Sequence, residues 1–174
     1  KTNEVLDTRQ KFLCVSRPRR FGKSMAADML AAYYERGEDS AELFGTLKIS
    51  KVESYEKNRN QYDIIKVNMQ EFLSMTHSMD EMLSMLQKYL IFDLTDHFDN
   101  VRFRDENNLI QVMKDIYSKT KHSFVILIDE WDCLFREYQQ DQEAQKKYLD
   151  FLRAWLKDKD YVALAYMTGI LPIK

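Results

Sequence analysis

Apolar residues are arranged along this chain in two different ways. Four short stretches are mainly apolar and bounded by polar residues: 12–15, 64–69, 124–128 and 161–167. Such runs predict strands of a buried parallel sheet. The run FVILI at 124–128 is apolar on both alternating faces, so we expect this strand at the centre of the sheet.

Longer segments between these runs carry apolar residues every three or four positions, which predicts amphipathic helices. They cover residues 24–36, 79–90, 108–119 and 141–158. In the first segment the residues that share a face are Met25, Met29, Leu30 and Tyr33. Methionines at this spacing predict a buried face rather than a binding surface. Residues 45–63 are polar and turn-rich and predict a long connector.

The order strand, helix, strand, helices, strand, helix, strand predicts an α/β fold with a mainly parallel sheet between two helical layers. The 174 residues are expected to form one domain, 1–174. Because the chain starts at Lys1 and stops soon after its last apolar run, we interpret it as a fragment of a longer protein.

Charge and cysteine content limit the binding partners and the compartment expected for this chain. The net charge of −2 provides no overall attraction to nucleic acids or anionic membranes. Cys14 and Cys133 are too few for a disulfide framework and predict reduced thiols in a cytoplasmic protein. No segment reaches the ~18 apolar residues of a membrane span. His77, His97 and His122 lack the spacing of a zinc site.

The segment SRPRRFGKS, residues 16–24, is typical of a phosphate-binding loop. The pattern is G-x-x-x-x-G-K-[ST], with Arg17 in place of the first glycine. Since the segment follows a predicted strand and opens a predicted helix, free N–H groups and the helix dipole favour an anion there. The alternative is a basic loop that contains GKS by chance.

Within this loop, each residue type suits one part of nucleotide binding. Gly22 lets the backbone approach a phosphate, Lys23 reaches the β- and γ-phosphates, and the Ser24 hydroxyl binds Mg²⁺. Arg17 and Pro18 are expected to shape the start of the loop. The remaining loop residues are expected to contact the nucleotide: Arg19, Arg20 and Phe21. The alternative for the two arginines is that they point to solvent or pair with acidic residues of a neighbour.

The second motif is the acidic pair Asp129-Glu130, which directly follows the strand predicted at 124–128. Asp129 is predicted to hold Mg²⁺ and Glu130 to act as the base that activates water. Thr168, near the end of the last strand, is predicted to sense the γ-phosphate if that strand lies between the other two. The alternatives are a solvated charged turn after Asp129 and a threonine that only begins a turn before Gly169.

These residues resemble the family of predicted AAA-ATPases, or AAA-ATPase-like domains, over essentially the whole chain. The resemblance is carried by four segments: RPRRFGKS (17–24), LFGTLKIS (43–50), LIDEWD (127–132) and MTGILPIK (167–174). It implies a P-loop NTPase of the glutamate-base branch, truncated before its last core strand, and ATP with Mg²⁺ as ligands. It also implies a nuclease-like domain C-terminal to this one.

Several functions remain open from the sequence. The first is an ATPase acting as a switch or motor for a partner domain. The second is a nucleotide-binding regulatory module with little hydrolysis, since no helical lid or arginine finger is visible. A P-loop kinase is disfavoured because Glu130 directly follows Asp129. A nucleic-acid binder is disfavoured by the net charge. The oligomeric state is not indicated.

Overall fold

The computed structural model describes residues 2–6, 8, 11–18 and 20–171, and the chain divides into two compact units. The sheet unit comprises residues 1–67, 123–131 and 162–174, and the helical unit comprises residues 68–122 and 132–161. None of the described helices is both long enough and apolar enough to cross a bilayer.

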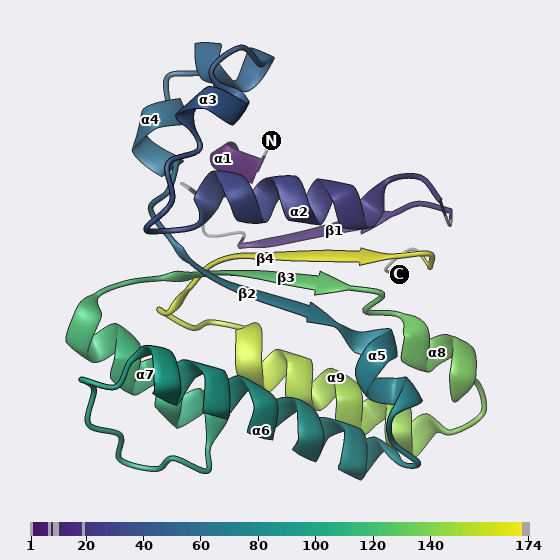
Figure 1. Cartoon of the computed structure of the whole chain (residues 1–174). Helices are drawn as coiled ribbons and strands as arrows, with labels where there is room; N and C mark the ends of the chain where they lie inside the picture. Colours follow the sequence, from purple (N-terminus) through teal and green to yellow (C-terminus); the bar gives the residue numbers. More distant parts are fainter. Residues whose placement is uncertain (1, 7, 9–10, 19, 172–174) are drawn as a thin grey trace. The chain divides into compact units, whose positions relative to one another are not determined.

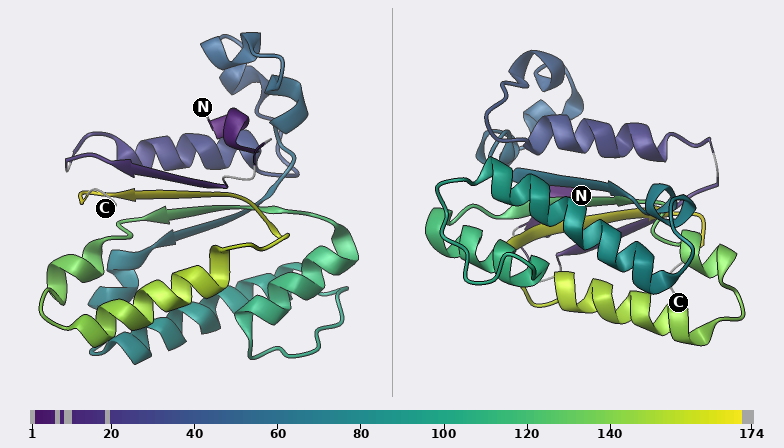
Figure 2. Two further views of the ribbon diagram at one scale, coloured as in Figure 1. Left: turned by 180° about the vertical axis from the view of Figure 1, so that it is seen from behind. Right: turned by 60° about the horizontal axis from the view of Figure 1, so that its bottom comes forward.

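The described residues of the sheet unit form four strands that run in the same direction (Figure 1). They are β1 (Phe12–Ser16), β2 (Asp63–Asn68, of which Asn68 is counted with the helical unit), β3 (Phe124–Asp129) and β4 (Val162–Gly169). Their order across the sheet is β1-β4-β3-β2, as the left view in Figure 2 shows. The predicted α/β class and parallel sheet are confirmed, and β4 lies between the loop strand and the Asp129 strand.

Helix α2 (Lys23–Tyr34) packs on one face of this sheet. Val125 and Leu127 of β3 alternate onto that face, as do Leu164 and Tyr166 of β4, because side chains two apart on a strand share a face. They form a core with four aromatic side chains: Tyr33, Tyr34, Phe44 and Tyr55. This core fixes α2, and with it the loop that precedes α2, against the two central strands.

The predicted buried face of α2 is wrong in part. Tyr33 is buried as predicted, together with Ala27 and Tyr34, but Met25 and Met29 are 68% and 47% exposed. The aromatic residues at the end of α2 decide the orientation, because they fill the core described above. Other methionines, including Met82 and Met113 of the helical unit, are buried as predicted.

The predicted connector at 45–63 is also wrong in part, because it contains short helices. The segment after α2 forms α3 (Ala41–Phe44), η1 (Lys48–Lys51) and α4 (Tyr55–Asn58). Polar contacts hold it together: Asn60 Oδ1 accepts from the Ser40 backbone and hydroxyl, and Arg59 pairs with Asp39 and Glu56. Such contacts leave no hydrophobic periodicity for a sequence pattern to detect.

The helical unit contains five helices. They are α5 (Met69–Ser74), α6 (Met79–His97), α7 (Leu109–Thr120), α8 (Cys133–Glu137) and α9 (Gln142–Leu156). Side-chain caps begin the longer ones: Ser78, Asn108 and Asp141 each accept a bond from a backbone N–H in the first turn. Buried Trp155 of α9 donates to the Met113 sulfur of α7 at 3.1 Å, which joins two helices of this unit.

A buried polar cluster ties helix α1 (Thr2–Leu6) to the sheet unit. Asn3 donates to the Tyr33 hydroxyl at 3.0 Å and accepts from the Tyr34 hydroxyl at 2.7 Å. Tyr33 in turn donates to the Tyr55 carbonyl at 2.8 Å. One amide therefore connects α1, α2 and, through Tyr33, α4.

This cluster leads to a stability prediction. Asn3→Ala should lower the free energy of unfolding by about 1–3 kcal/mol, because the buried Tyr34 hydroxyl loses its acceptor. The double variant Asn3→Ala/Tyr34→Phe should recover part of that loss, since the stranded hydroxyl is gone. Urea unfolding of the wild type, both single variants and the double variant measures these effects. A double variant that loses the sum of the two single losses would contradict the account.

Candidate functional site

The loop of residues 17–22 connects β1 to α2 and is fastened to the end of β4. The Arg17 N–H donates to the Gly169 carbonyl at 3.1 Å, and the Ser16 hydroxyl donates to the Ile170 carbonyl at 2.7 Å. Arg20 (φ 67°) and Gly22 (φ 71°) both lie in the left-handed region, which turns the chain sharply into α2. Arg19 lies outside the described residues.

The Lys23 side chain links the start of this loop to its end through hydrogen bonds. The side chain is buried, and its ammonium donates to the carbonyls of Arg17 at 3.0 Å and Pro18 at 3.3 Å. The same ammonium lies 3.9 Å from Glu130 Oε1. Backbone carbonyls thus hold the Lys23 ammonium near the N-terminus of α2. Its positive charge adds to that of the free N–H groups in the first turn of the helix.

Asp129 joins three parts of the sheet unit. Its Oδ2 accepts a bond from the Ser24 hydroxyl at 2.5 Å, and its Oδ1 accepts from the Thr168 hydroxyl and from the Glu130 N–H at 3.0 Å. Thr168 is fully buried and Asp129 nearly so. Carboxyl ends of neighbouring parallel strands meet at one edge, so Asp129 and Thr168 lie side by side where α2 begins.

Glu130 turns out of the strand beside the loop. Its φ is 51°, an uncommon value for a residue other than glycine, and it follows the last residue of β3. The next N–H, that of Trp131, donates to the Thr168 carbonyl at 3.1 Å. This bond holds the turn against β4 while the Glu130 carboxylate faces Lys23.

One pKa near this cluster is perturbed. Burial raises the pKa of the Tyr166 phenol, and electrostatic interactions with Asp129 and Cys14 raise it further. Tyr166 is a residue of the core on which α2 packs.

The residues that could hold a divalent cation are few. Across the described part of the chain, no three His, Cys, Asp or Glu side chains come together as a metal-binding group. Mg²⁺ bound with a nucleotide needs less, because phosphates and water complete its shell around one hydroxyl and one carboxylate. Ser24 and Asp129 fit that requirement, since their oxygens already touch next to Lys23.

The structure thus brings together five of the residues predicted from the sequence: Lys23, Ser24, Asp129, Glu130 and Thr168. Arg20 and Phe21 lie on the exposed side of the loop. Sequence reasoning missed the carbonyls of Arg17 and Pro18 as partners of Lys23. Every residue has a backbone carbonyl, so the sequence does not indicate which carbonyls will accept a hydrogen bond from Lys23.

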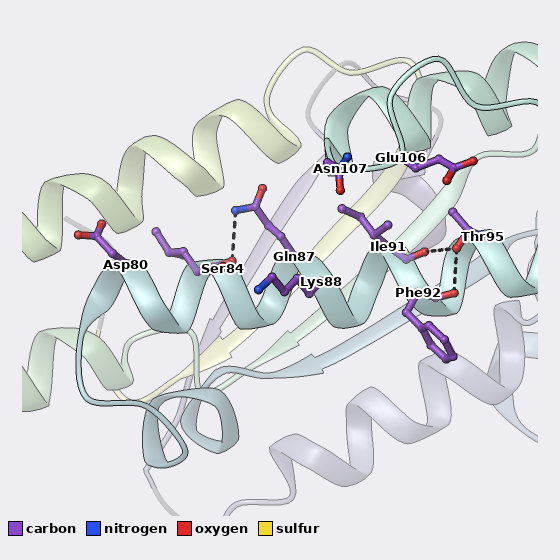
Figure 3. A pocket seen from close by; sticks show the side chains of 10 residues that line it. Asp80, Ser84, Gln87, Lys88, Ile91, Phe92, Thr95, Glu106 and Asn107 are labelled. Carbon is purple, nitrogen blue, oxygen red and sulfur yellow. Dashed lines mark hydrogen bonds between the residues drawn. The ribbon is translucent and has the colours of Figure 1, made fainter.

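The helical unit has a hollow of its own, drawn in Figure 3. A groove of about 640 Å³ runs along α6 and is lined by Asp80, Gln87, Lys88 and Phe92, with Glu106 at one end. Its charges are of both signs, and it shares no residue with the Asp129 cluster.

The chain is similar to a known protein family over nearly its whole length. A family model described as "Predicted AAA-ATPase" (AAA-ATPase_like) matches residues 2–174. No curated protein matches the chain.

The loop geometry predicts how Gly22 tolerates substitution. A Cβ at Gly22 would meet no atom within 4 Å, so glycine is required by its φ of 71° and not by lack of space. Gly22→Ala should therefore lower the free energy of unfolding by about 1–2 kcal/mol through backbone strain. Gly22→Asn should cost less, because asparagine adopts this region more readily. Urea unfolding compares the three, and an alanine variant as stable as the wild type would refute the strain.

Proposed function

The chain belongs to the AAA-ATPase-like family of predicted AAA-ATPases, and from this premise we propose that it binds ATP with Mg²⁺ at the loop of residues 17–24 and hydrolyses it. The observation that carries the proposal is the convergence of Ser24 and Thr168 on Asp129, next to the loop lysine. A chance GKS sequence in a surface loop would not require a buried carboxylate from a distant strand at its serine.

The loop and the first turn of α2 bind the phosphates. The N-terminal N–H groups of α2 are free to donate to phosphate oxygens, and the helix dipole favours negative charge there. Lys23 exchanges its two carbonyl acceptors for phosphate oxygens, which are charged and therefore stronger partners. Arg20 is exposed beside this point and can contribute a further positive charge.

Mg²⁺ held by Ser24 and Asp129 would neutralise charge on the β- and γ-phosphates. Glu130 then acts as the base toward a water in line with the γ-phosphate. Its carboxylate becomes available when the phosphate draws Lys23 away, since the two groups are 3.9 Å apart in the structure. Thr168 senses whether the γ-phosphate is present through its hydrogen bond to Asp129.

A regulatory module that binds nucleotide with little hydrolysis is the second candidate. It is favoured by the same Lys23–Glu130 contact, because a base that remains paired with lysine does not activate water. In either case we propose that nucleotide binding acts on a partner domain as a switch.

Two substitutions test the proposal by binding and by turnover. Lys23→Ala should weaken MgATP binding by about 10- to 100-fold, the value of a charge-assisted hydrogen bond in affinity units. Glu130→Gln should retain binding but lower turnover by about 100-fold or more, because the base is lost. Isothermal titration and phosphate release measure the two quantities.

The controls for this experiment come from the same unit. Lys51→Ala and Glu42→Gln remove equal charges at exposed positions of η1 and α3 and should change neither quantity. Unaltered ATP affinity in Lys23→Ala would exclude this site. Unaltered turnover in Glu130→Gln, with wild-type activity present, would exclude Glu130 as the base. Absence of turnover in a wild type that binds ATP would select the regulatory module.

A further inference from the structure

The loop carries an aromatic side chain that the phosphate chemistry does not use. Phe21 is 67% exposed, although a phenyl ring gains free energy by leaving water. It stands between Arg20 and Gly22, which both have a left-handed backbone conformation. These two conformations turn the backbone before and after Phe21 and leave its ring at the solvent side of the loop.

Exposed phenylalanines are common one at a time and need no explanation by themselves. The position of Phe21 is what distinguishes it. It precedes Gly22 and Lys23, the residues closest to the proposed phosphate site, and Met25 in the first turn of α2 is as exposed as Phe21. Phe92 of α6 is a comparably exposed phenylalanine with no phosphate-binding sequence beside it.

A nucleotide supplies an occupant for this position. Its base is joined to the phosphates by a single ribose, so a nucleotide held by its phosphates on the loop must place its base within one nucleotide's length of Gly22 and Lys23. The base is flat and apolar on its faces, and stacking on an aromatic side chain is a general mode of base recognition. The loop therefore offers a phosphate site and a stacking surface in adjacent residues.

We infer that Phe21 stacks on the base of the bound nucleotide and makes the site prefer purine over pyrimidine triphosphates. The inference rests on the proposed function of the same loop. A purine has two fused rings and covers more of a phenyl ring than a pyrimidine does, so it gains more from the contact. A phenyl ring has no hydrogen-bonding group, so Phe21 treats adenine and guanine alike.

The test separates the base from the phosphates by using a ligand that lacks a base. Binding of ATP, GTP, CTP and inorganic tripolyphosphate, each with Mg²⁺, is measured by isothermal titration for the wild type, Phe21→Ala and Phe21→Tyr. Phe21→Ala should weaken ATP and GTP about tenfold, CTP less, and tripolyphosphate less than about twofold. Phe21→Tyr should bind all four as the wild type does, because it keeps an aromatic face.

The control is Phe92→Ala, which removes an exposed ring of the helical unit and should change none of the four affinities. Equal weakening of ATP and tripolyphosphate by Phe21→Ala would mean that the ring supports the loop and would overturn the inference. Unchanged ATP binding in Phe21→Ala would overturn the inference as well. The exposed ring would then be a candidate contact for a macromolecular partner instead.

A parallel titration of Lys23→Ala distinguishes failure of this inference from failure of the proposed function. If Lys23→Ala weakens both ATP and tripolyphosphate while Phe21→Ala weakens neither, the phosphate site stands and only the stacking role is wrong. If Lys23→Ala weakens neither ligand, the proposed function fails, and the stacking role fails with it.

Discussion

The hydrogen bonds that converge on the Asp129 carboxylate are the interaction on which the site depends. They link the first turn of α2, the tip of β3 and the end of β4 in one place. This is feasible only because β4 lies between β1 and β3 and all three run in the same direction. If β4 did not lie beside β3, the Thr168 hydroxyl could not reach the Asp129 carboxylate. The sheet order is therefore a requirement of the site.

Backbone strain is also present at this edge of the sheet. Arg20, Gly22 and Glu130 all have positive φ, and two of the three are not glycine. Each such non-glycine residue costs of order 1–3 kcal/mol, which persists only where surrounding contacts outweigh it. Here those contacts are the Lys23 bonds to the loop carbonyls and the Trp131 bond to Thr168. The conformation of the loop is thereby held by contacts within the protein itself.

Much of this could be predicted from the sequence, for physical reasons that differ between elements. The FVILI strand and the acidic pair after it were predictable because a central strand is apolar on both faces and ends where polarity returns. The burial of Met25 and Met29 in α2 was mispredicted because these exposed residues satisfy the same spacing as the buried Tyr33. The short helices after α2 depend on Asn60 and Arg59 contacts, which have no period. The carbonyl partners of Lys23 were not predictable, since they depend on how the loop folds back.

The central claim is that Ser24 and Asp129 act as one magnesium site rather than as two separate polar residues. A double-mutant cycle on the Mg²⁺-dependent part of ATP affinity tests it directly, using Ser24→Ala, Asp129→Asn and the double variant. If both residues hold the same ion, the second substitution should cost far less once the first is present, with a coupling above about 1 kcal/mol. Losses that simply add, or ATP affinity that does not depend on Mg²⁺ in the wild type, would contradict the account.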